Sequence, residues 1–438
     1  TMTLGQAMGL PASLVQVQLV VAALLWGTGA SPTTSHWAGA SAHQPHILIV
    51  MTDSADGRSV DPTDQRVFPA MATPNMDRLR RKSANFVRTY SPNPLCIPSR
   101  VATLTGRSSD HTSVWSNGWA LACRRGRDGR YSIPSDQCRA RYDAEYCQSL
   151  CDEQGVQSVL FDHFQDAGWA VKRVGKYHIG ADFGDVKYER IFGDPRHLVG
   201  TLAREARVAK PFGPGVYSKT THGDLQVADR HDPKPPSKYP VDLETLRKCK
   251  QHIHRAPLPQ DQGFRPHLLY CSFFFPHPPY DSNAKYMGRI DTSKIRIPVH
   301  RAPEDMHPAD RYASTQKSQL SYVVHLRDGT PRIVNRSLSP KDDRQIIHTY
   351  YGMLAQVDDW VGDLLRALDQ RADRDQWYVV YLSDHGEMAR EHDQTRKATM
   401  YEGSVRVPLL IQGPGVKPQT TTHPSSLLDL VPTLLDLA

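Results

Sequence analysis

Short apolar runs separated by helical patterns constrain the fold of this 438-residue chain more than any other feature. Residues 46–51 are almost entirely apolar, which is typical of a strand buried on both faces of a sheet. Similar runs follow at 169–171, 268–275, 377–382 and 407–411. Because strands that alternate with helices form sheets covered on both faces, we expect an α/β fold with a mostly parallel central sheet flanked by helices.

The clearest helical pattern covers residues 347–368, where apolar residues recur every three or four positions. Segments 195–262 and 281–340 are rich in Pro, Arg, Asp and His and show little periodicity. We expect long loops and insertions there, around the active face of one large domain. The last residues, 427–438, have the pattern of the start of an amphipathic helix.

Composition limits the classes of partner. The charged fraction of 23% and the hydrophobic fraction of 39% are typical of a globular protein. The net charge of +7 and the 20 histidines favour acidic partners, namely sulfated glycans, nucleic acid or anionic lipid, although a solvated basic surface is the simpler interpretation. No aromatic-basic repeat or nucleic-acid motif accompanies the charge, so we predict no nucleic-acid partner.

An apolar stretch near the N-terminus, residues 14–26, is followed by small residues. This order is typical of a signal peptide, although residues 1–30 contain no Lys or Arg. The stretch is too short for a membrane span. We therefore predict a signal peptide at 1–30, entry into the secretory pathway and no stable membrane span.

The seven cysteines fit that compartment, because an even number, six, remains if Cys96 is set aside. Four of them crowd into a polar, Arg-rich segment at about 119–155: Cys123, Cys138, Cys147 and Cys151. We predict a disulfide-stapled insertion there, with three possible pairings, since a zinc site would lack the usual Cys-x-x-Cys spacing. Residues 335–337, Asn-Arg-Ser, form a glycosylation sequon that we place in a polar loop.

Polar residues follow two of the expected strands. Asp53 and Ser54 come after the first strand, and Asp384 and His385 come after the run at 377–382. A single Asp after a strand is usually a turn or cap residue. Two such strand ends open at the same edge of a parallel sheet, where carboxylate oxygens suit a hard cation such as calcium.

The most specific motif runs from Cys96 to Arg100, Cys-Ile-Pro-Ser-Arg, with Leu-Thr-Gly at 104–106. This pattern resembles the signature of the sulfatase family, which implies an alkaline-phosphatase-like fold. The resemblance implies that a formylglycine-generating enzyme oxidises Cys96 to 3-oxoalanine (formylglycine), whose hydrate is the nucleophile. Arg100 would stabilise that hydrate. The alternative is an ordinary cysteine beside a chance Pro-Ser-Arg.

The same resemblance implies a Ca²⁺ site formed by Asp53, Cys96, Asp384 and His385. Many members of the family have Asp-Asp at the first position, whereas this chain has Asp53-Ser54. Either Ser54 or Asp56 is left to complete the metal site.

Residues 175–180, Gly-Lys-Tyr-His-Ile-Gly, resemble a second family element. It implies that Lys176 binds the sulfate and that His178 acts as a base toward the hydrate. His277 would contact the sulfate and protonate the leaving alcohol, and Lys397 would bind a sulfate oxygen. Considered alone, these residues are as well explained by a turn and a proline-rich loop.

The resemblance covers residues 44–438 apart from the cysteine-rich insertion, and sulfatases continue into a smaller C-terminal subdomain, so we expect a truncated chain. Residues 304–310, Glu391 and His392 are candidates for substrate selection. We expect a lysosomal or extracellular sulfuric ester hydrolase that removes 2-sulfate from uronate residues of glycosaminoglycans. The alternatives are a sulfatase for choline sulfate or iduronate 2-sulfate, a phosphonate monoester hydrolase, or a non-catalytic relative that binds sulfated glycans.

Overall fold

The computed structural model describes residues 44–117, 124–125, 131–132, 158–179, 239–278, 280, 282, 284–299, 301–317, 319–325, 331–337 and 340–438. The predicted signal peptide and the four clustered cysteines lie outside these residues. None of the helices in the described part of the chain is both long and apolar enough to cross a membrane.

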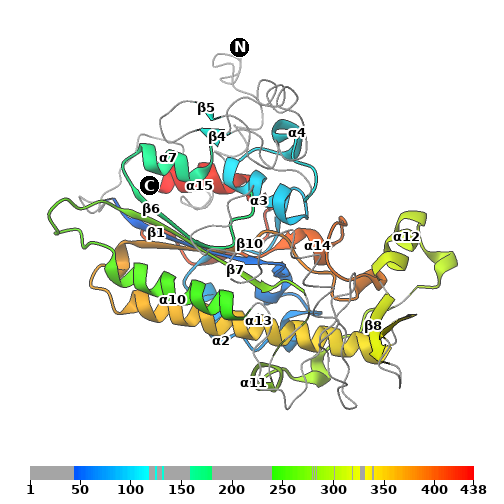
Figure 1. Ribbon diagram of the computed structural model, residues 1–438. Helices are drawn as coiled ribbons and strands as arrows, with labels where there is room; N and C mark the ends of the chain where they lie inside the picture. Colours follow the sequence, from blue (N-terminus) through cyan, green and yellow to red (C-terminus); the bar gives the residue numbers. More distant parts are fainter. Residues whose placement is uncertain are drawn as a thin grey trace, which may run out of the picture.

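A seven-stranded sheet forms the centre of the molecule (Figure 1). Its order is β13 (Gln419–Thr421), β2 (Ala84–Phe86), β12 (Leu409–Gln412), β10 (Trp377–Ser383), β1 (His46–Asp53), β7 (His267–Pro276) and β6 (Ala170–Gly175). The strands from β10 to β6 are parallel, whereas β12 is antiparallel to both of its neighbours. Each apolar run found in the sequence lies in or overlaps a strand, and the predicted fold class is confirmed.

Helices cover both faces of the sheet, as Figure 1 shows. On one face lie α2 (Pro74–Arg81), α10 (Tyr239–Arg255) and α13 (Pro340–Asp369), and on the other α3 (Cys96–Thr105), α7 (Leu160–Asp166) and α15 (Leu430–Leu437). A hydrophobic core lies on each face of the sheet. Strand β1 contributes side chains to both cores, because alternate side chains of a strand point to opposite faces. Leu48 and Val50 pack with α10 and α13, and Ile47 and Ile49 pack with α3 and α15.

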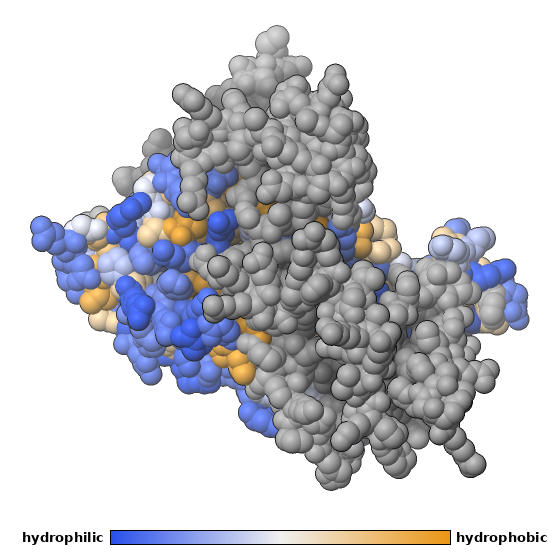
Figure 2. Space-filling model, viewed as in Figure 1, coloured by the Kyte–Doolittle hydropathy of each residue, from blue (hydrophilic) through white to orange (hydrophobic). Residues whose placement is uncertain are grey.

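Smaller elements surround this body. They are η2 (Gly57–Val60), η3 (Phe68–Ala70), β3 (Thr89–Tyr90), α4 (Ser109–Thr112), β4 (Arg124–Arg125), β5 (Tyr131–Ser132), α11 (Ala284–Met287), η4 (Thr292–Lys294), η5 (Pro303–Asp305), α12 (Pro308–Lys317), β8 (Gln319–His325), β9 (Pro331–Ser337), η6 (Arg374–Gln376), η7 (Glu391–Asp393), α14 (Glu402–Val405), β11 (Arg406–Val407), β14 (Ser425–Ser426) and η8 (Leu427–Asp429). Figure 2 shows a largely hydrophilic described surface on the side of α10 and α13.

The prediction of long loops at 195–262 and 281–340 is wrong for part of each of these two segments. Helix α10 lies within 195–262, and α11, α12 and the β8–β9 hairpin lie within 281–340. Periodicity missed α10 because its buried side includes Asp242, which accepts hydrogen bonds from the backbone N–H groups of Phe274 and Phe275 at 2.9 and 3.0 Å. A polar residue that binds the end of β7 thus interrupts the apolar stripe. The sequon at 335–337, which we expected in a loop, ends strand β9.

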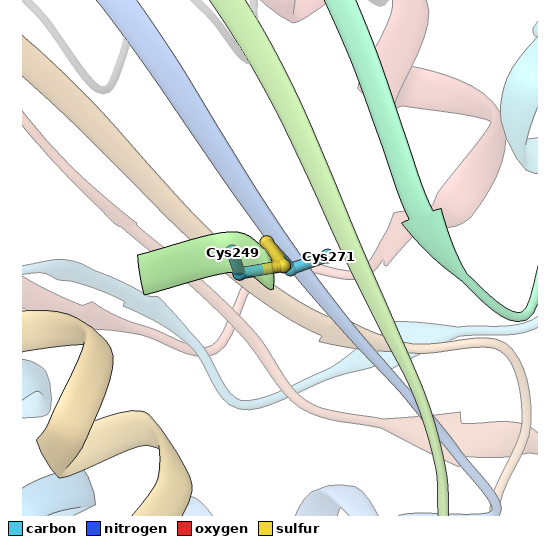
Figure 3. Close-up of a disulfide and its surroundings, with 2 residues drawn as sticks. All are labelled: Cys249 and Cys271. Atoms are coloured by element: carbon cyan, nitrogen blue, oxygen red, sulfur yellow. A yellow bond between two sulfur atoms is a disulfide. The ribbon is translucent and has the colours of Figure 1, made fainter. Parts of the chain in front are cut away.

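A disulfide joins Cys249 of α10 to Cys271 of β7 (Figure 3). Both residues are fully buried. The bond attaches the helix to a central strand. Cys249 and Cys271 are the two cysteines that remain once Cys96 and the four clustered cysteines are set aside.

Candidate active site

Asp53 and Asp384 meet at the carboxyl edge of the sheet because β1 and β10 are parallel neighbours. Thr52 lies opposite Ser383 in the strand register, so the residues that follow them leave the sheet together. Both carboxylates and the adjacent His385 are fully buried. The structure thereby brings together side chains that the sequence placed after two distant strands.

Cys96 joins this group from the first residue of α3, and its Sγ lies 3.2 Å from Nε2 of His385. Ligand atoms of Asp53, Cys96, Asp384 and His385 all lie within 4.8 Å of one another. Oxygen ligands of calcium stand about 2.3–2.6 Å from the ion, so ligands on opposite sides are up to about 5 Å apart. The four side chains therefore fit around one such ion, with Sγ in the place of the oxygen that the predicted oxidation of Cys96 would put there.

The structure separates the two candidates for the remaining metal position. Ser54, whose backbone φ is 72°, directs its Oγ to Asp53 Oδ1 at 3.2 Å and to His385 Nδ1 at 3.4 Å. Asp56 instead accepts two hydrogen bonds from Arg58 Nε at 3.0 Å and one from Nη2 at 2.6 Å. Ser54 thus contacts two members of the cluster, whereas the carboxylate of Asp56 is paired with Arg58.

Arg100 lies one helical turn after Cys96 and is fully buried. Its Nε donates to Asp384 Oδ2 at 2.7 Å, and its Nη1 donates to the carbonyl of Lys176 and to Ser272 Oγ, both at 2.9 Å. Burial opposes its charge, yet Asp384 and the other acidic groups raise the pKa of Arg100 above its usual value. The guanidinium therefore stays charged, and its hydrogen bonds join the segments that follow β10 and β6 to strand β7.

Lys176 and His178 follow β6 directly. Lys176 forms a buried ion pair with Asp53 Oδ2. His178 has a φ of 54° and hydrogen-bonds to Cys96. Burial, followed by the charge of Lys176, lowers the pKa of His178, which favours the neutral imidazole that a base requires.

Lys397 and His277 complete a positive environment. Burial by itself would raise the pKa of the Cys96 thiol, but the charges of Lys176, Lys397 and His385 hold it well below its usual value. His277 follows β7, and its Nδ1 contacts the carbonyl of Pro278. Burial and the charge of Cys96 would raise the pKa of Asp53, but Lys176, His277 and His385 hold it well below its usual value. Such surroundings suit a tetrahedral anion.

Sequence reasoning did not single out the residues that hold these groups in place. Ser99 Oγ donates to the carbonyl of Asp384. Glu387 is fully buried, and its Oε1 accepts from Tyr280 Oη at 2.5 Å and from the backbone N–H of Ala389 at 3.2 Å. Glu387 thus fixes the start of the loop that ends at Lys397. Ser99 stands inside the motif from Cys96 to Arg100, and Glu387 follows His385 by two positions, so closeness to the candidate residues in the sequence was the available signal.

A cavity of about 450 Å³ lies beside the cluster at the same edge of the sheet. Tyr350 of α13 belongs to its wall and donates a hydrogen bond from Oη to the carbonyl of Ser54 at 2.7 Å. Four residues predicted as candidates for substrate selection line it: Met306, Asp310, Glu391 and His392. The cluster of Asp53, Cys96, Asp384 and His385 does not line this cavity.

Comparison with known proteins gives one family match. A family model described as Sulfatase matches residues 45–438. Arylsulfatase K of Canis lupus familiaris is 26% identical over 418 residues, which cover 92% of this chain and 64% of that protein. Choline-sulfatase of Rhizobium meliloti (strain 1021) is 27% identical over 402 residues, covering 90% of this chain and 68% of that protein. The chain thus spans less than two thirds of the length of the arylsulfatase K relative.

Solved structures show the same fold. A 2-O GAG sulfatase has a TM-score of 0.54 at 17% identity, covering 90% of this chain and 70% of that one. The phosphonate monoester hydrolase of Agrobacterium radiobacter has a TM-score of 0.58 at 20% identity, covering 90% of this chain and 73% of that one.

Proposed function

Because this chain belongs to the sulfatase family, we propose that it hydrolyses sulfate esters at the site built around Cys96. One observation carries the proposal: Asp53, Cys96, Asp384 and His385 form a single buried group at the carboxyl edge of the sheet. Ligands and substrates of open α/β sheets bind at this edge.

Two groups that the family implies are assigned to this cluster. Formylglycine at position 96 supplies a hydrate nucleophile, and Ca²⁺ held by the cluster supplies positive charge against the sulfate oxygens. The buried carboxylates of Asp53 and Asp384, with His385 and Ser54 beside them, support this assignment.

The other side chains have separate tasks in the proposal. Lys176 and Lys397 bind sulfate oxygens, and His277 protonates the leaving alcohol. Neutral His178 accepts a proton at the position of Cys96, to which it is hydrogen-bonded. Arg100 keeps Asp384 oriented through the 2.7 Å hydrogen bond.

For the substrate we propose the 2-sulfate of a uronate residue in a glycosaminoglycan. The similarity to arylsulfatase K, and the presence of a 2-O GAG sulfatase among the proteins of the same fold, support this class. Choline sulfate is a second candidate, which the similarity to choline-sulfatase favours. A phosphonate monoester is a third, from the fold alone.

We propose that the protein matures in the secretory pathway, where a formylglycine-generating enzyme meets it, and that it acts in lysosomes or outside the cell. The buried disulfide between Cys249 and Cys271 supports an oxidising compartment.

The test is to express the chain in a secretory host, determine the mass of the tryptic peptide that contains position 96, and assay an aryl sulfate and an aryl phosphonate. We expect the formylglycine mass and hydrolysis of the sulfate. Cys96→Ala should remove activity. An unmodified Cys96, from cells that convert a control sulfatase, would instead favour a glycan-binding protein without catalysis.

A further inference from the structure

The cavity beside the catalytic cluster contains a charge pattern that the reaction at Cys96 does not use. Its inner wall holds a buried network in which Arg58 contacts Asp56 at 2.6 Å and Glu391 at 2.7 Å. At its mouth stand three exposed arginines, Arg66, Arg296 and Arg301.

The two sets of charges differ in whether they are paired. Arg58 is matched by two carboxylates, so its charge is neutralised within the protein. Arg66, Arg296 and Arg301 form no ion pair with any Asp or Glu in the part of the chain that the structure describes. Exposed arginines in this state present planar hydrogen-bond donors to carboxylate or sulfate groups.

The cavity is rigidly connected to the catalytic cluster. Tyr350 Oη accepts a hydrogen bond from the backbone N–H of Asp56 at 2.9 Å and donates to the Ser54 carbonyl at 2.7 Å. On the far side His392 stacks on Tyr401 with ring centroids 3.7 Å apart, and Tyr401 hydrogen-bonds to Asp310. A ligand that reaches from the cluster into the cavity therefore meets walls that are already in place.

The lining suits a sugar better than a purely apolar or cationic ligand. The carboxylate of Asp310 in the lining can accept hydrogen bonds from hydroxyl groups, and Val299 and Met306 offer apolar surface. The volume of about 450 Å³ is in the range that small-molecule sites occupy. The three arginines at the mouth, which have no carboxylate partner in the described part of the chain, favour an anionic ligand there.

We propose that this cavity is a subsite for an anionic sugar unit of the substrate, whose carboxylate or sulfate groups bind Arg66, Arg296 and Arg301. The inference rests on the proposed sulfatase function and extends it, because it assigns the extended substrate to a carboxylated or sulfated oligosaccharide.

The test compares two triple variants with the same change in charge. One is Arg66→Gln, Arg296→Gln and Arg301→Gln. The matched control is Arg81→Gln, Arg107→Gln and Arg255→Gln, three exposed arginines elsewhere in the fold that do not line the cavity. The probes are a 2-O-sulfated glycosaminoglycan tetrasaccharide and 4-nitrophenyl sulfate, which carries no sugar and no anionic group besides its sulfate ester.

We expect the first variant to raise KM for the tetrasaccharide by about tenfold or more, because three charged contacts are lost. Hydrolysis of 4-nitrophenyl sulfate should stay within about twofold of the unchanged protein. The control variant should alter neither reaction. Equal effects of the two variants on the tetrasaccharide would overturn the subsite while leaving the sulfatase function intact.

If the unchanged protein hydrolyses neither probe, the proposed function fails and the subsite is judged by calorimetric binding of the tetrasaccharide. Binding about tenfold weaker in the first variant than in the control then supports the subsite. Equal binding refutes it.

Discussion

Arg100 Nε lies 2.7 Å from Asp384 Oδ2, although 284 positions separate the two residues in the sequence. Both side chains are fully buried. The pair fastens α3, whose first residue is Cys96, to the segment directly after β10 that contains Asp384 and His385. The geometry of the candidate metal site therefore depends on this contact.

Replacing Arg100 by Met should destabilise the protein by about 3–5 kcal/mol, because Asp384 is left as an unpaired buried charge. Denaturant unfolding measures the loss. Arg107→Met, at an exposed position just after the same helix, is the control and should change stability by less than about 0.5 kcal/mol. Similar losses in both variants would show that the buried pair has no special role.

Gly175 should be irreplaceable, because a Cβ there would lie 1.9 Å from the carbonyl oxygen of Ser272. Gly175→Ala is expected to push β6 away from β7, to cost about 3 kcal/mol or more and to displace Lys176. Gly168 has the same φ of +88°, but a Cβ added there would have no atom within 4 Å, so Gly168→Ala should cost only the backbone penalty of about 1–2 kcal/mol. Thermal unfolding and aryl sulfate hydrolysis compare the two, and equal losses would contradict the steric argument.

The disulfide between Cys249 and Cys271 closes a loop with a sequence separation of 22. Removing both sulfurs by Cys249→Ala and Cys271→Ala should lower the free energy of unfolding by about 2–4 kcal/mol. Each single variant should lose about as much as the double variant, since either change opens the bond. Alkylation of both thiols in the unreduced protein would show that the bond does not form.

Acid should weaken the fold at the start of β1 and β7. Burial, assisted by neighbouring positive charges, lowers the pKa of His267 from 6.5 to about 4, and burial does the same for His46. At pH values between about 4 and 6.5 the folded protein binds fewer protons than the unfolded chain. The free energy of unfolding therefore falls as the pH decreases from about 6.5 to about 4.

His267→Gln should therefore show a smaller fall in Tm than the unchanged protein between pH 7 and pH 4.5. Differential scanning calorimetry at a series of pH values measures this, with the exposed His423→Gln as control. If the Tm of His267→Gln falls as far on acidification as the Tm of the control variant, protonation of His267 does not cause the loss of stability in acid.

Calcium should raise the Tm by about 3–5 °C at a hundredfold excess over its dissociation constant, because an ion that binds only the folded state stabilises it. Asp53→Asn should abolish this shift, since it removes a carboxylate from the cluster. The exposed Asp436→Asn should keep it. A shift that survives Asp53→Asn would place the calcium elsewhere.

Much of the sheet could be predicted from the sequence, because a strand buried on both faces must be apolar over its whole length. The run at 377–382 shows this, since β10 is buried throughout. Helix α10 could not be predicted in the same way, because Asp242 lies on its buried side and forms hydrogen bonds with β7. A local pattern cannot reveal a partner that only packing provides.

The sequence by itself determined which residues are candidates for chemistry, because the motif around Cys96 and the polar strand ends combine residue types at fixed spacings. Tertiary structure decided how they act together. The parallel register of β1 and β10 places Asp53 beside Asp384, and Arg58 pairs with the carboxylate of Asp56. Folding also gathers distant loops around one cavity with arginines at its mouth. Spacing along the chain records local chemistry, whereas these relationships depend on strand order and packing between segments that lie far apart in sequence.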